Sequence, residues 1–425
     1  MLSLQYIREH GDLVRAALER RHVETPLTRI LDVDARRRQL LQELEAERGQ
    51  RNQRSSRIGT TKDPAARQAL IDETRSMSSR IGELEPAVKQ IEADLDALLL
   101  QMPNLPDESI PDGEDAEDNV EVRAWGQPRV FGYPARPHWE IGEELGIIEF
   151  ERGVKISGSR FQALVGDGAA LSRALISLML EMHIAEHGYT EIAPPYLVRP
   201  EAMLGTGQLP KFEDEAYRIE RDELYLIPTA EVPLINLHRA EIFEPEVLPI
   251  RYCAYSACFR REAGAAGRDT RGLIRVHQFD KVEMVQFVAP KDASAALEAM
   301  TGHAEAVLQR LGLPYRIMIL CSGDLGLNSR KTYDLEVWMP GQARFVEISS
   351  CSTMGDFQSR RADIKYRPEA GAHAEYVHTL NGSGLAVGRT MAALLETYQQ
   401  EDGTVEIPTA LRAYLGGRER LSRRA

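Results

Sequence analysis

The segment FRREAGAAGRDTRGLIRVHQFDKVE (259–283) decides how this chain is interpreted, because it concentrates positive charge in an acidic protein. It holds five arginines and one lysine, whereas the whole chain has a formal net charge of −13. An acidic balance argues against broad nonspecific binding of nucleic acid, but a local basic patch can still meet an anion. The segment therefore predicts a site for an anionic ligand.

Two strands flank the glycine-rich connection GAAGRDTRG (264–272) in this segment. The second predicted strand covers 274–288 and is rich in aromatic and β-branched residues. Because side chains alternate along a strand, Arg275, Phe279 and Glu283 are expected on one face. A cation, an aromatic ring and a carboxylate on one face suit a nucleotide together with a substrate that carries an amine or a hydroxyl. The alternative is a solvent-facing hairpin charged for solubility.

The composition predicts a large folded protein of the cytoplasm. The chain has 425 residues and is 43% hydrophobic, enough for two or three domains with sizeable cores. No apolar run approaches the roughly 18 residues of a membrane helix, and the first residues, MLSLQYIREHGD, lack the apolar core of a secretion signal. We therefore expect a cytoplasmic protein without membrane contact. The four cysteines form no C-x-x-C pair, so buried thiols are expected and no zinc.

A coiled-coil hairpin is predicted near the N-terminus, over about 30–102. Its second helix carries apolar residues at alternating steps of four and three, and its first helix, 30–58, is the partner. Gly59 is expected to stop the first helix, Pro64 to begin the second, and Pro86 to kink it. The seam of the second helix comprises Leu70, Thr74, Met77, Ile81, Leu84, Val88, Ile91, Leu95 and Leu98.

Towards the tip of this hairpin the first helix becomes basic. Arginines recur there every three residues, at Arg48, Arg51, Arg54 and Arg57. Composition alone leaves two readings open, a solvated helix face and a patch that contacts phosphates. A long projecting arm favours the binding reading, because two helices alone bury little core.

The rest of the chain predicts an α+β domain. The proline-rich and acidic stretch 104–118 is expected to be a linker between an N-terminal domain, 1–103, and a domain covering 119–425. Strand and helix patterns mix in the larger part without regular alternation, which favours a mostly antiparallel sheet flanked by helices. The common nucleotide-binding loops GxxxxGK[ST] and GxGxxG are missing from the sequence.

Taken together, these stretches resemble one family along essentially the whole chain. FRREAGAAGRDTRGLIRVHQFDKVEM (259–284) is similar to motif 2 of class II aminoacyl-tRNA synthetases, in the form found in seryl-tRNA synthetases. GLAVGRTMAALLE (384–396) resembles motif 3, and the helix before EIAPPYLV (191–198) resembles motif 1, with Pro195 matching its proline. IPTAEVPL (227–234) resembles the amino-acid-binding loop, and the hairpin resembles the tRNA-binding arm.

The resemblance implies a fold and a reaction. The fold is an antiparallel catalytic sheet of six or seven strands, with an N-terminal two-helix arm, in a homodimer formed through motif 1. In the reaction, L-serine and ATP give seryl-adenylate and pyrophosphate, and the seryl group then passes to tRNA(Ser) and also to tRNA(Sec). An α-carboxylate is already ionised at neutral pH, so the site needs cations and positioning rather than a general base.

The resemblance also assigns roles to the nucleotide-binding residues. Arg260 bridges the α-phosphate and the serine carboxylate, and Arg389 meets the γ-phosphate. Glu262 contacts the adenine amino group, and Phe279 stacks on the adenine. No role follows for Arg261, which stands where a small polar residue is expected. The full set implied for ATP is Arg260, Arg261, Glu262, Arg268, Arg275, Val276, Phe279, Glu347, Ile348, Ser349, Ser350 and Arg389.

For serine and magnesium the resemblance implies further positions. The serine ammonium meets Glu231, and the hydroxyl meets Glu283 and Ser383. Glu347 and Ser350 match the magnesium-binding positions, although strict alternation would place them on opposite faces, so a bend or bulge is expected in that strand. The implied serine set is Thr229, Ala230, Glu231, Arg260, Glu283 and Ser383.

Two other functions compete with tRNA charging. One is a catalytically silent, synthetase-like protein that senses amino acids or scaffolds a complex, and the intact arginines disfavour it. The other is a related ligase that charges a carrier protein, and such relatives lack the arm. The basic tip (Arg48 to Arg57) is the expected contact with tRNA.

Overall fold

The computed structural model describes residues 1–264 and 271–423, so the predicted ATP ligand Arg268 lies outside the described residues. The described chain divides into two compact units. One unit comprises Leu2–Leu18 and Glu24–Pro103, and the other comprises Met1, Glu19–Val23 and Asn104–Ala425.

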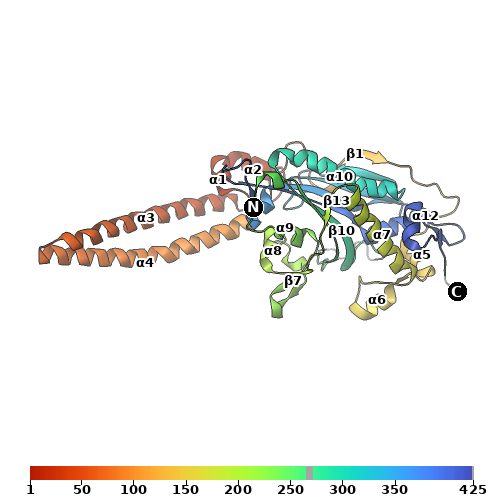
Figure 1. Cartoon of the computed structure of the whole chain (residues 1–425), viewed down its shortest axis with the longest axis horizontal. Helices are drawn as coiled ribbons and strands as arrows, with labels where there is room; N and C mark the ends of the chain where they lie inside the picture. The colour runs from red at the N-terminus through yellow and green to blue at the C-terminus, as the bar shows by residue number, and fades with distance from the viewer. Residues whose placement is uncertain (265–270, 424–425) are drawn as a thin grey trace. The chain divides into compact units, whose positions relative to one another are not determined.

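The first unit is built around a long helical hairpin (Figure 1). Helices α3 (Leu27–Thr60) and α4 (Pro64–Gln101) pack against each other along their length. Two short helices, α1 (Leu4–Glu9) and α2 (Gly11–Glu19), precede them. Asp63 caps α4 by accepting from the Ala66 N–H, and Pro64 takes the first helical position, as predicted.

The predicted seam of α4 is confirmed by its burial. Each of its nine positions is buried or half-buried, and the seam packs on Leu40 and Leu44 of α3. One expectation was wrong, because Gly59 does not stop α3, which ends at Thr60. Helix α4 continues past Pro86 to Gln101, and a kink or a local loss of hydrogen bonds at Pro86 stays a prediction. Proline removes one backbone donor there, and the packing of Leu84 and Val88 on both sides of it holds the helix together.

The second unit contains a mixed sheet, in which the described residues form eight strands rather than six or seven. Neighbouring strands are antiparallel except for β4 and β9, which are parallel. The predicted fold class is thus confirmed. In spatial order the strands are β1 (Val120–Trp125), β11 (Tyr315–Ile319), β12 (Lys331–Met339), β13 (Arg344–Gly355), β16 (His378–Ala386), β10 (Gln278–Val288), β9 (Ile250–Phe259) and β4 (Thr190–Glu191).

Helices cover the sheet and short ladders surround it. The helices are α5 (His138–Glu144), α6 (Phe150–Ser157), α7 (Asp167–Ala185), α8 (Pro200–Gly205), α9 (Glu231–Asn236), α10 (Ala293–Arg310), α11 (Phe357–Ala362), α12 (Val387–Tyr398) and α13 (Thr409–Arg412). The short strands are β2 (Ile148–Glu149), β3 (Ala163–Leu164), β5 (Leu197–Val198), β6 (Arg218–Ile219), β7 (Leu224–Leu226), β8 (Ile242–Phe243), β14 (Lys365–Tyr366), β15 (Glu375–Tyr376), β17 (Val405–Glu406) and β18 (Arg420–Leu421).

The two faces of β10 bury different cores. Val282 and Met284 join the main core, which α7, α10 and α12 cover. Val285 and Phe287 point the other way and pack with residues of α9 and α11. Because alternate residues share a face, the side chains of 279, 281 and 283 lie on the α9–α11 side of the sheet. The predicted ligand-binding face is therefore the one that the long helices leave uncovered.

Helix α7 is long and apolar enough to cross a membrane by length and composition, contrary to the expectation that no run approaches that length. Half of its apolar window is buried in the structure. Leu175, Met179 and Met182 lie in the main core with the sheet. This burial is that of a core helix in a folded domain.

The segment 104–118, predicted as a linker, forms part of the second unit. Asn104 donates its side-chain N–H groups to the carbonyls of Asn328 and Met354, each at 2.7 Å, and Ile110 is buried. The four cysteines are all buried and unpaired by disulfides. The absence of zinc stays a prediction.

Candidate active site

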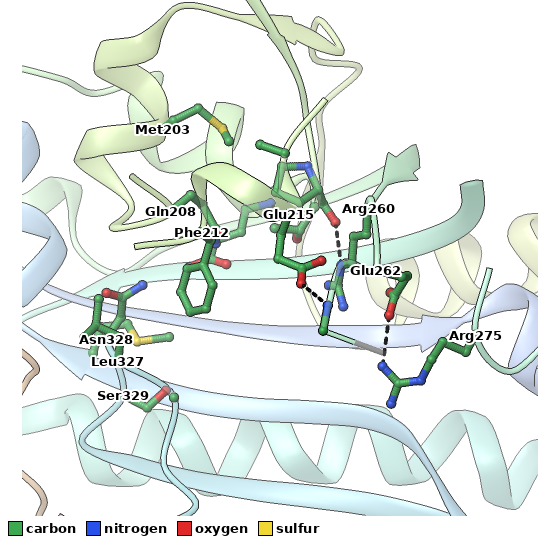
Figure 2. Close-up of a pocket in the computed structure, with 17 residues that line it drawn as sticks. Met203, Gln208, Phe212, Glu215, Arg260, Glu262, Arg275, Leu327, Asn328 and Ser329 are labelled. Carbon is green, nitrogen blue, oxygen red and sulfur yellow. Dashed lines mark hydrogen bonds and ion pairs between the residues drawn. The ribbon is translucent and has the colours of Figure 1, made fainter. Parts of the chain in front are cut away.

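Two neighbouring cavities open on the α9–α11 face of the sheet. The larger one, of about 450 Å³, is lined by Thr229, Glu231 and Asn328 among others (Figure 2). The smaller one, of about 160 Å³, is lined by the predicted nucleotide-binding residues of motifs 2 and 3. The linings have three residues in common, Arg260, Glu262 and Arg275.

Arg260 follows the end of β9 and stands where the two cavities meet. Its Nε donates to the carbonyl of Pro228 at 3.4 Å, which is a long hydrogen bond. Its guanidinium lies over the ring of Phe279, 5.1 Å from the centroid. A cation–π contact of this kind holds the arginine against the ring without fixing it rigidly.

Glu262 and Arg275 form an ion pair beside Arg260. Arg275 donates from Nη1 to Glu262 Oε2 at 2.9 Å, and Figure 2 shows the two side chains directed at each other. Strand β10 begins at Gln278, so Arg275 precedes the strand instead of lying in it as predicted. Strand alternation therefore does not place Arg275, which reaches the cavity from the preceding loop.

The strand face itself carries Phe279, Lys281 and Glu283. Lys281 was missed by sequence reasoning, although the alternation that joins Phe279 to Glu283 also includes it. Its ammonium lies 2.6 Å from Glu283 Oε2, with both side chains almost fully buried. Such a buried pair is costly to break, because removing one partner leaves the other charge uncompensated.

Glu283 and Ser383 are direct cross-strand neighbours in the β10–β16 ladder. Directly opposed residues share a face, so the predicted hydroxyl-binding pair is brought together. Asn381, two residues before Ser383, donates to Glu283 Oε1 at 3.4 Å and was also missed. Glu283 Oε2 is paired with the Lys281 ammonium at 2.6 Å, and its remaining lone-pair capacity can accept from a ligand. Ser383 and Lys281 line the smaller cavity.

Glu231 opens α9 and faces the larger cavity from a buried position. Burial raises the pKa of its carboxyl to about 7, and the nearby charge of Glu283 acts in the same direction. Thr229 supports the start of α9 by accepting from the Glu231 N–H at 3.2 Å. Ala230 is buried in the core under α9, so it can offer a ligand only its backbone.

Strand β13 carries the predicted bulge. The pairing with β12 shifts between Leu335 and Glu336, so that Glu336 opposes Glu347 and Asp334 opposes Ser350. Asp334 and Glu336 are two residues apart and share a face, and their partners Glu347 and Ser350 therefore share it too. The expectation of a bulge in this strand is confirmed.

Ile348 and Ser349 lie between Glu347 and Ser350 and make contacts within the fold. Ile348 is buried in the main core and also forms part of the lining of the smaller cavity. Ser349 donates from Oγ to the carbonyl of Ser383 at 2.6 Å and ties the bulge to β16. Asp334 is a half-buried neighbour whose buried Oδ1 has no hydrogen-bond partner among the described residues. Burial, and next the charge of Glu347, raise the pKa of this carboxyl.

Arg389 lies in the first turn of α12 and reaches across to β13. It donates to the carbonyl of Glu347 at 2.7 Å and to that of Ile274 at 3.2 Å, and its Nη1 lies 3.4 Å from Glu347 Oε1. Val276 is buried and lines the same cavity. Arg389 and Glu347 are thus held together by contacts within the protein itself.

Arg261 is among the predicted residues that line neither cavity, together with Ala230, Glu283, Ser349 and Ser350. Its Nη1 donates to the carbonyl of Asp214 at 3.1 Å. The carboxylate of Glu215 accepts from the backbone N–H groups of Ala263 and Gly264. Arg261 therefore helps to hold the short helix at 213–215 against the start of the motif 2 loop.

In the separate arm unit, the four tip arginines do not form one exposed stripe. Arg51 and Arg54 are half-buried and continue the seam positions of α3, which explains why the apolar seam ends there. Arg54 pairs with Glu73 and Arg48 with Glu85 of α4, each at 2.7 Å. Arg57 is exposed. Tip arginines thus contribute to hairpin packing as well as to surface charge.

Comparisons with known proteins agree with this site and this arm. The family model for the class II tRNA synthetase core domain (G, H, P, S and T) matches residues 211–398, and that for the seryl-tRNA synthetase N-terminal domain matches residues 1–106. A serine–tRNA ligase of Thermomicrobium roseum is 54% identical over 423 residues, covering 100% of this chain and 95% of the relative.

Solved structures show the same similarity. Seryl-tRNA synthetase from Pyrococcus horikoshii, complexed with ATP, superposes with a TM-score of 0.94 at 38% identity and covers 100% of both chains. The cytoplasmic serine–tRNA ligase from Naegleria fowleri, in complex with AMP, has a TM-score of 0.88 at 30% identity and covers 100% of this chain and 99% of that one. The chain described here belongs to the seryl-tRNA synthetase family of class II aminoacyl-tRNA synthetases.

Proposed function

We propose that this protein is a serine–tRNA ligase that forms seryl-adenylate from L-serine and ATP, with release of pyrophosphate, and then transfers the seryl group to tRNA(Ser). Its relatives over the full length carry that activity in their names. The proposal extends to tRNA(Sec) as a second acceptor, to a homodimer formed through motif 1 and to the cytoplasm as its location. The arm unit is proposed as the tRNA-binding domain and 119–425 as the catalytic domain.

The observation that carries the proposal is the position of Arg260 in the lining of both cavities. One cavity offers Glu231 and Thr229, and the other offers Phe279, Glu347 and Arg389. A reaction that joins an amino-acid carboxylate to the α-phosphate of ATP needs a cation at the point where two anions meet. Arg260 stands at that point.

The two substrates are proposed to bind through groups of matching charge. The serine ammonium pairs with the Glu231 carboxylate, and the serine carboxylate pairs with Arg260. The serine hydroxyl bonds to Glu283 and Ser383. A site that bonds a hydroxyl discriminates against alanine, because Glu283 would then remain buried without that partner.

The nucleotide is proposed to occupy the smaller cavity. Phe279 offers a ring for adenine stacking, worth about 1–3 kcal/mol for a base on an aromatic side chain. Glu262 would leave its pair with Arg275 to bond the adenine amino group, and Arg275 would then be available to phosphate. Arg389, near the N-terminus of α12, adds positive charge for the γ-phosphate. No general base is required, because the attacking carboxylate is already ionised.

Magnesium fits the residues at the β13 bulge. Carboxylate and hydroxyl oxygens are the ligands that Mg²⁺ prefers, and Glu347 and Ser350 present them on one face. Asp334 beside them has a buried oxygen, Oδ1, without a hydrogen-bond partner among the described residues, and a nearby cation would stabilise it. When bound there, Mg²⁺ supplies positive charge to the triphosphate.

The experiment that tests the proposal is ATP–pyrophosphate exchange with each amino acid in turn, in buffer with Mg²⁺. Exchange that depends on serine, and is far weaker with alanine or threonine, is the expected result. No serine-dependent exchange would overturn the proposal and favour a silent, synthetase-like sensor or scaffold. Charging of tRNA(Ser) and tRNA(Sec) transcripts then tests the second step.

A further inference from the structure

A buried glutamine outside the two cavities touches the carboxylate that the proposed function assigns to the serine ammonium. Gln358, on α11, donates from Nε2 to Glu231 Oε1 at 2.6 Å. The same Nε2 lies 3.3 Å from the carbonyl of Thr206, and the Gln358 Oε1 accepts from the Thr379 hydroxyl at 2.7 Å. All four residues are buried, and Gln358 and Thr379 are fully inaccessible.

These contacts fix which way the Gln358 amide faces. The carbonyl of Thr206 can only accept, so the NH₂ end of the amide must point to it and to Glu231. The reversed amide would set its oxygen against two acceptors, Thr206 O and the Glu231 carboxylate. Thr379 occupies the other end and completes the arrangement, because its hydroxyl donates to the amide oxygen. The donor is therefore aimed at Glu231 by the fold and not by chance rotation.

The charged groups that face Glu231 explain why the Gln358 donor matters for the ionisation of that carboxyl group. Glu283 repels an ionised Glu231, whereas Lys281 and Arg260 attract it, and burial disfavours the charge altogether. Lys281 is already paired with Glu283 at 2.6 Å. Arg260 lies against Phe279 and is proposed to meet the serine carboxylate. Gln358 is a neutral side-chain donor directed at Glu231 from outside the two cavities.

We infer that Gln358 is a positioning residue that holds Glu231 in the ionised, cavity-facing form needed to bind the ammonium of serine, and that Thr379 sets the orientation of Gln358. The inference rests on the proposed function and names a residue that acts through Glu231 without touching substrate. A hydrogen bond to a charged group that lies in a buried site is stronger than one between neutral groups.

A specific pH dependence follows. Burial raises the pKa of Glu231 to about 7, so its carboxyl group is mostly protonated well below that pH and mostly ionised well above it. Loss of the Gln358 donor raises that pKa further, because the hydrogen bond favours the charged form. Serine binding by such a variant should then weaken most at acid pH and recover as the pH rises, until the ammonium of serine itself deprotonates.

The test is the KM for serine in ATP–pyrophosphate exchange between pH 6 and 8.5, for the wild-type chain and for Gln358→Met. Methionine keeps the length of glutamine and removes the donor. At pH 6.5 we expect a KM for serine about tenfold above wild type, with a much smaller ratio at pH 8.5 and an unchanged KM for ATP. Gln286→Leu is the matched control, because Gln286 is equally buried but bonds Tyr189 on the opposite face of the sheet.

A second pair of variants keeps the test decisive if Gln358→Met does not fold. Thr379→Val removes the hydroxyl that orients Gln358, and Thr379→Ser keeps it. The valine variant should reproduce the pH-dependent rise in KM in weaker form, and the serine variant should match wild type. A KM raised equally at every pH, or not raised at all, would overturn the inference while leaving the proposed function intact. Absence of serine-dependent exchange in the wild-type chain would instead overturn the proposed function.

Discussion

The guanidinium of Arg260 lies 5.1 Å from the ring centroid of Phe279, the ring that the proposed function assigns to adenine stacking. If adenine stacks on the face that Arg260 covers, the cation and the base compete for it. Among the described residues, the Arg260 guanidinium makes one hydrogen bond, a long one of 3.4 Å from Nε to the carbonyl of Pro228. This bond holds the guanidinium only weakly. ATP binding should displace Arg260 from the ring towards the α-phosphate, where the serine carboxylate also arrives.

Replacing Phe279 by leucine tests the stacking role. Leucine keeps apolar bulk but offers no π-face, so we expect the KM for ATP to rise by about tenfold, in line with the value of one stacked base. The KM for serine should change little. Exchange kinetics with each substrate varied separately measure the two constants. Equal increases in both, or no change for ATP, would contradict the role.

Replacing Glu283 by glutamine tests recognition of the serine hydroxyl. The change keeps the shape but removes the charge that balances Lys281, which lies 2.6 Å away. We expect serine-dependent exchange to fall by at least about a hundredfold, equivalent to roughly 3 kcal/mol, with milder damage to ATP binding. Glu121→Gln, at the exposed edge strand β1, serves as the control for a lost acid in the same sheet. Unchanged serine turnover in Glu283→Gln would remove Glu283 from the site.

The sequence predicted the helices, the strands and the ligand-binding face of β10 more accurately than it predicted the contacts between individual side chains. The alternation along β10 placed Phe279 and Glu283 correctly, and the spacing of Glu347 and Ser350 required the bulge that the β12–β13 pairing shows. Arg275 was misplaced because the strand begins at Gln278, and helix and strand ends depend on hydrogen bonds that propensity does not specify.

Other features depended on contacts between distant segments. Lys281 was within reach of the same alternation rule, but Gln358 was not, since its partners Glu231, Thr206 and Thr379 come from three other elements. In the arm, the arginine repeat gave no sign that Arg54 would pair across the hairpin with Glu73, because that depends on the register of two helices.

Replacing Glu347 by glutamine tests the magnesium site. An amide oxygen is a weaker ligand for Mg²⁺ than a carboxylate, so half-maximal exchange should require about tenfold more Mg²⁺. Ser350→Ala should shift the requirement in the same direction. The variant Glu406→Gln, which changes an exposed acid of β17, should leave it unchanged. A magnesium titration that is identical for wild type and Glu347→Gln would place the ion elsewhere.

Substitutions at the tip of the arm test its contact with RNA. Arg57 is exposed, whereas Arg48 pairs with Glu85 at 2.7 Å. Arg57→Gln should weaken tRNA binding and reduce the salt dependence by about one counterion, with pyrophosphate exchange unaffected. Arg48→Gln should have the smaller effect on binding, since its charge is partly neutralised within the hairpin.

Deletion of residues from about 30 to 100 should abolish most charging of tRNA and preserve ATP–pyrophosphate exchange. Charging near the wild-type level by this variant would exclude the arm from tRNA recognition.

The central claim is that one arginine joins the two substrates, and exchange by the wild-type chain beside an Arg260→Lys variant tests it most directly. Lysine keeps the charge but cannot bridge two anions with a planar fork. The account predicts strong serine-dependent exchange by the wild-type chain and a loss of at least about a hundredfold in the variant, with both serine and ATP constants affected. Exchange by Arg260→Lys at the wild-type rate would contradict it.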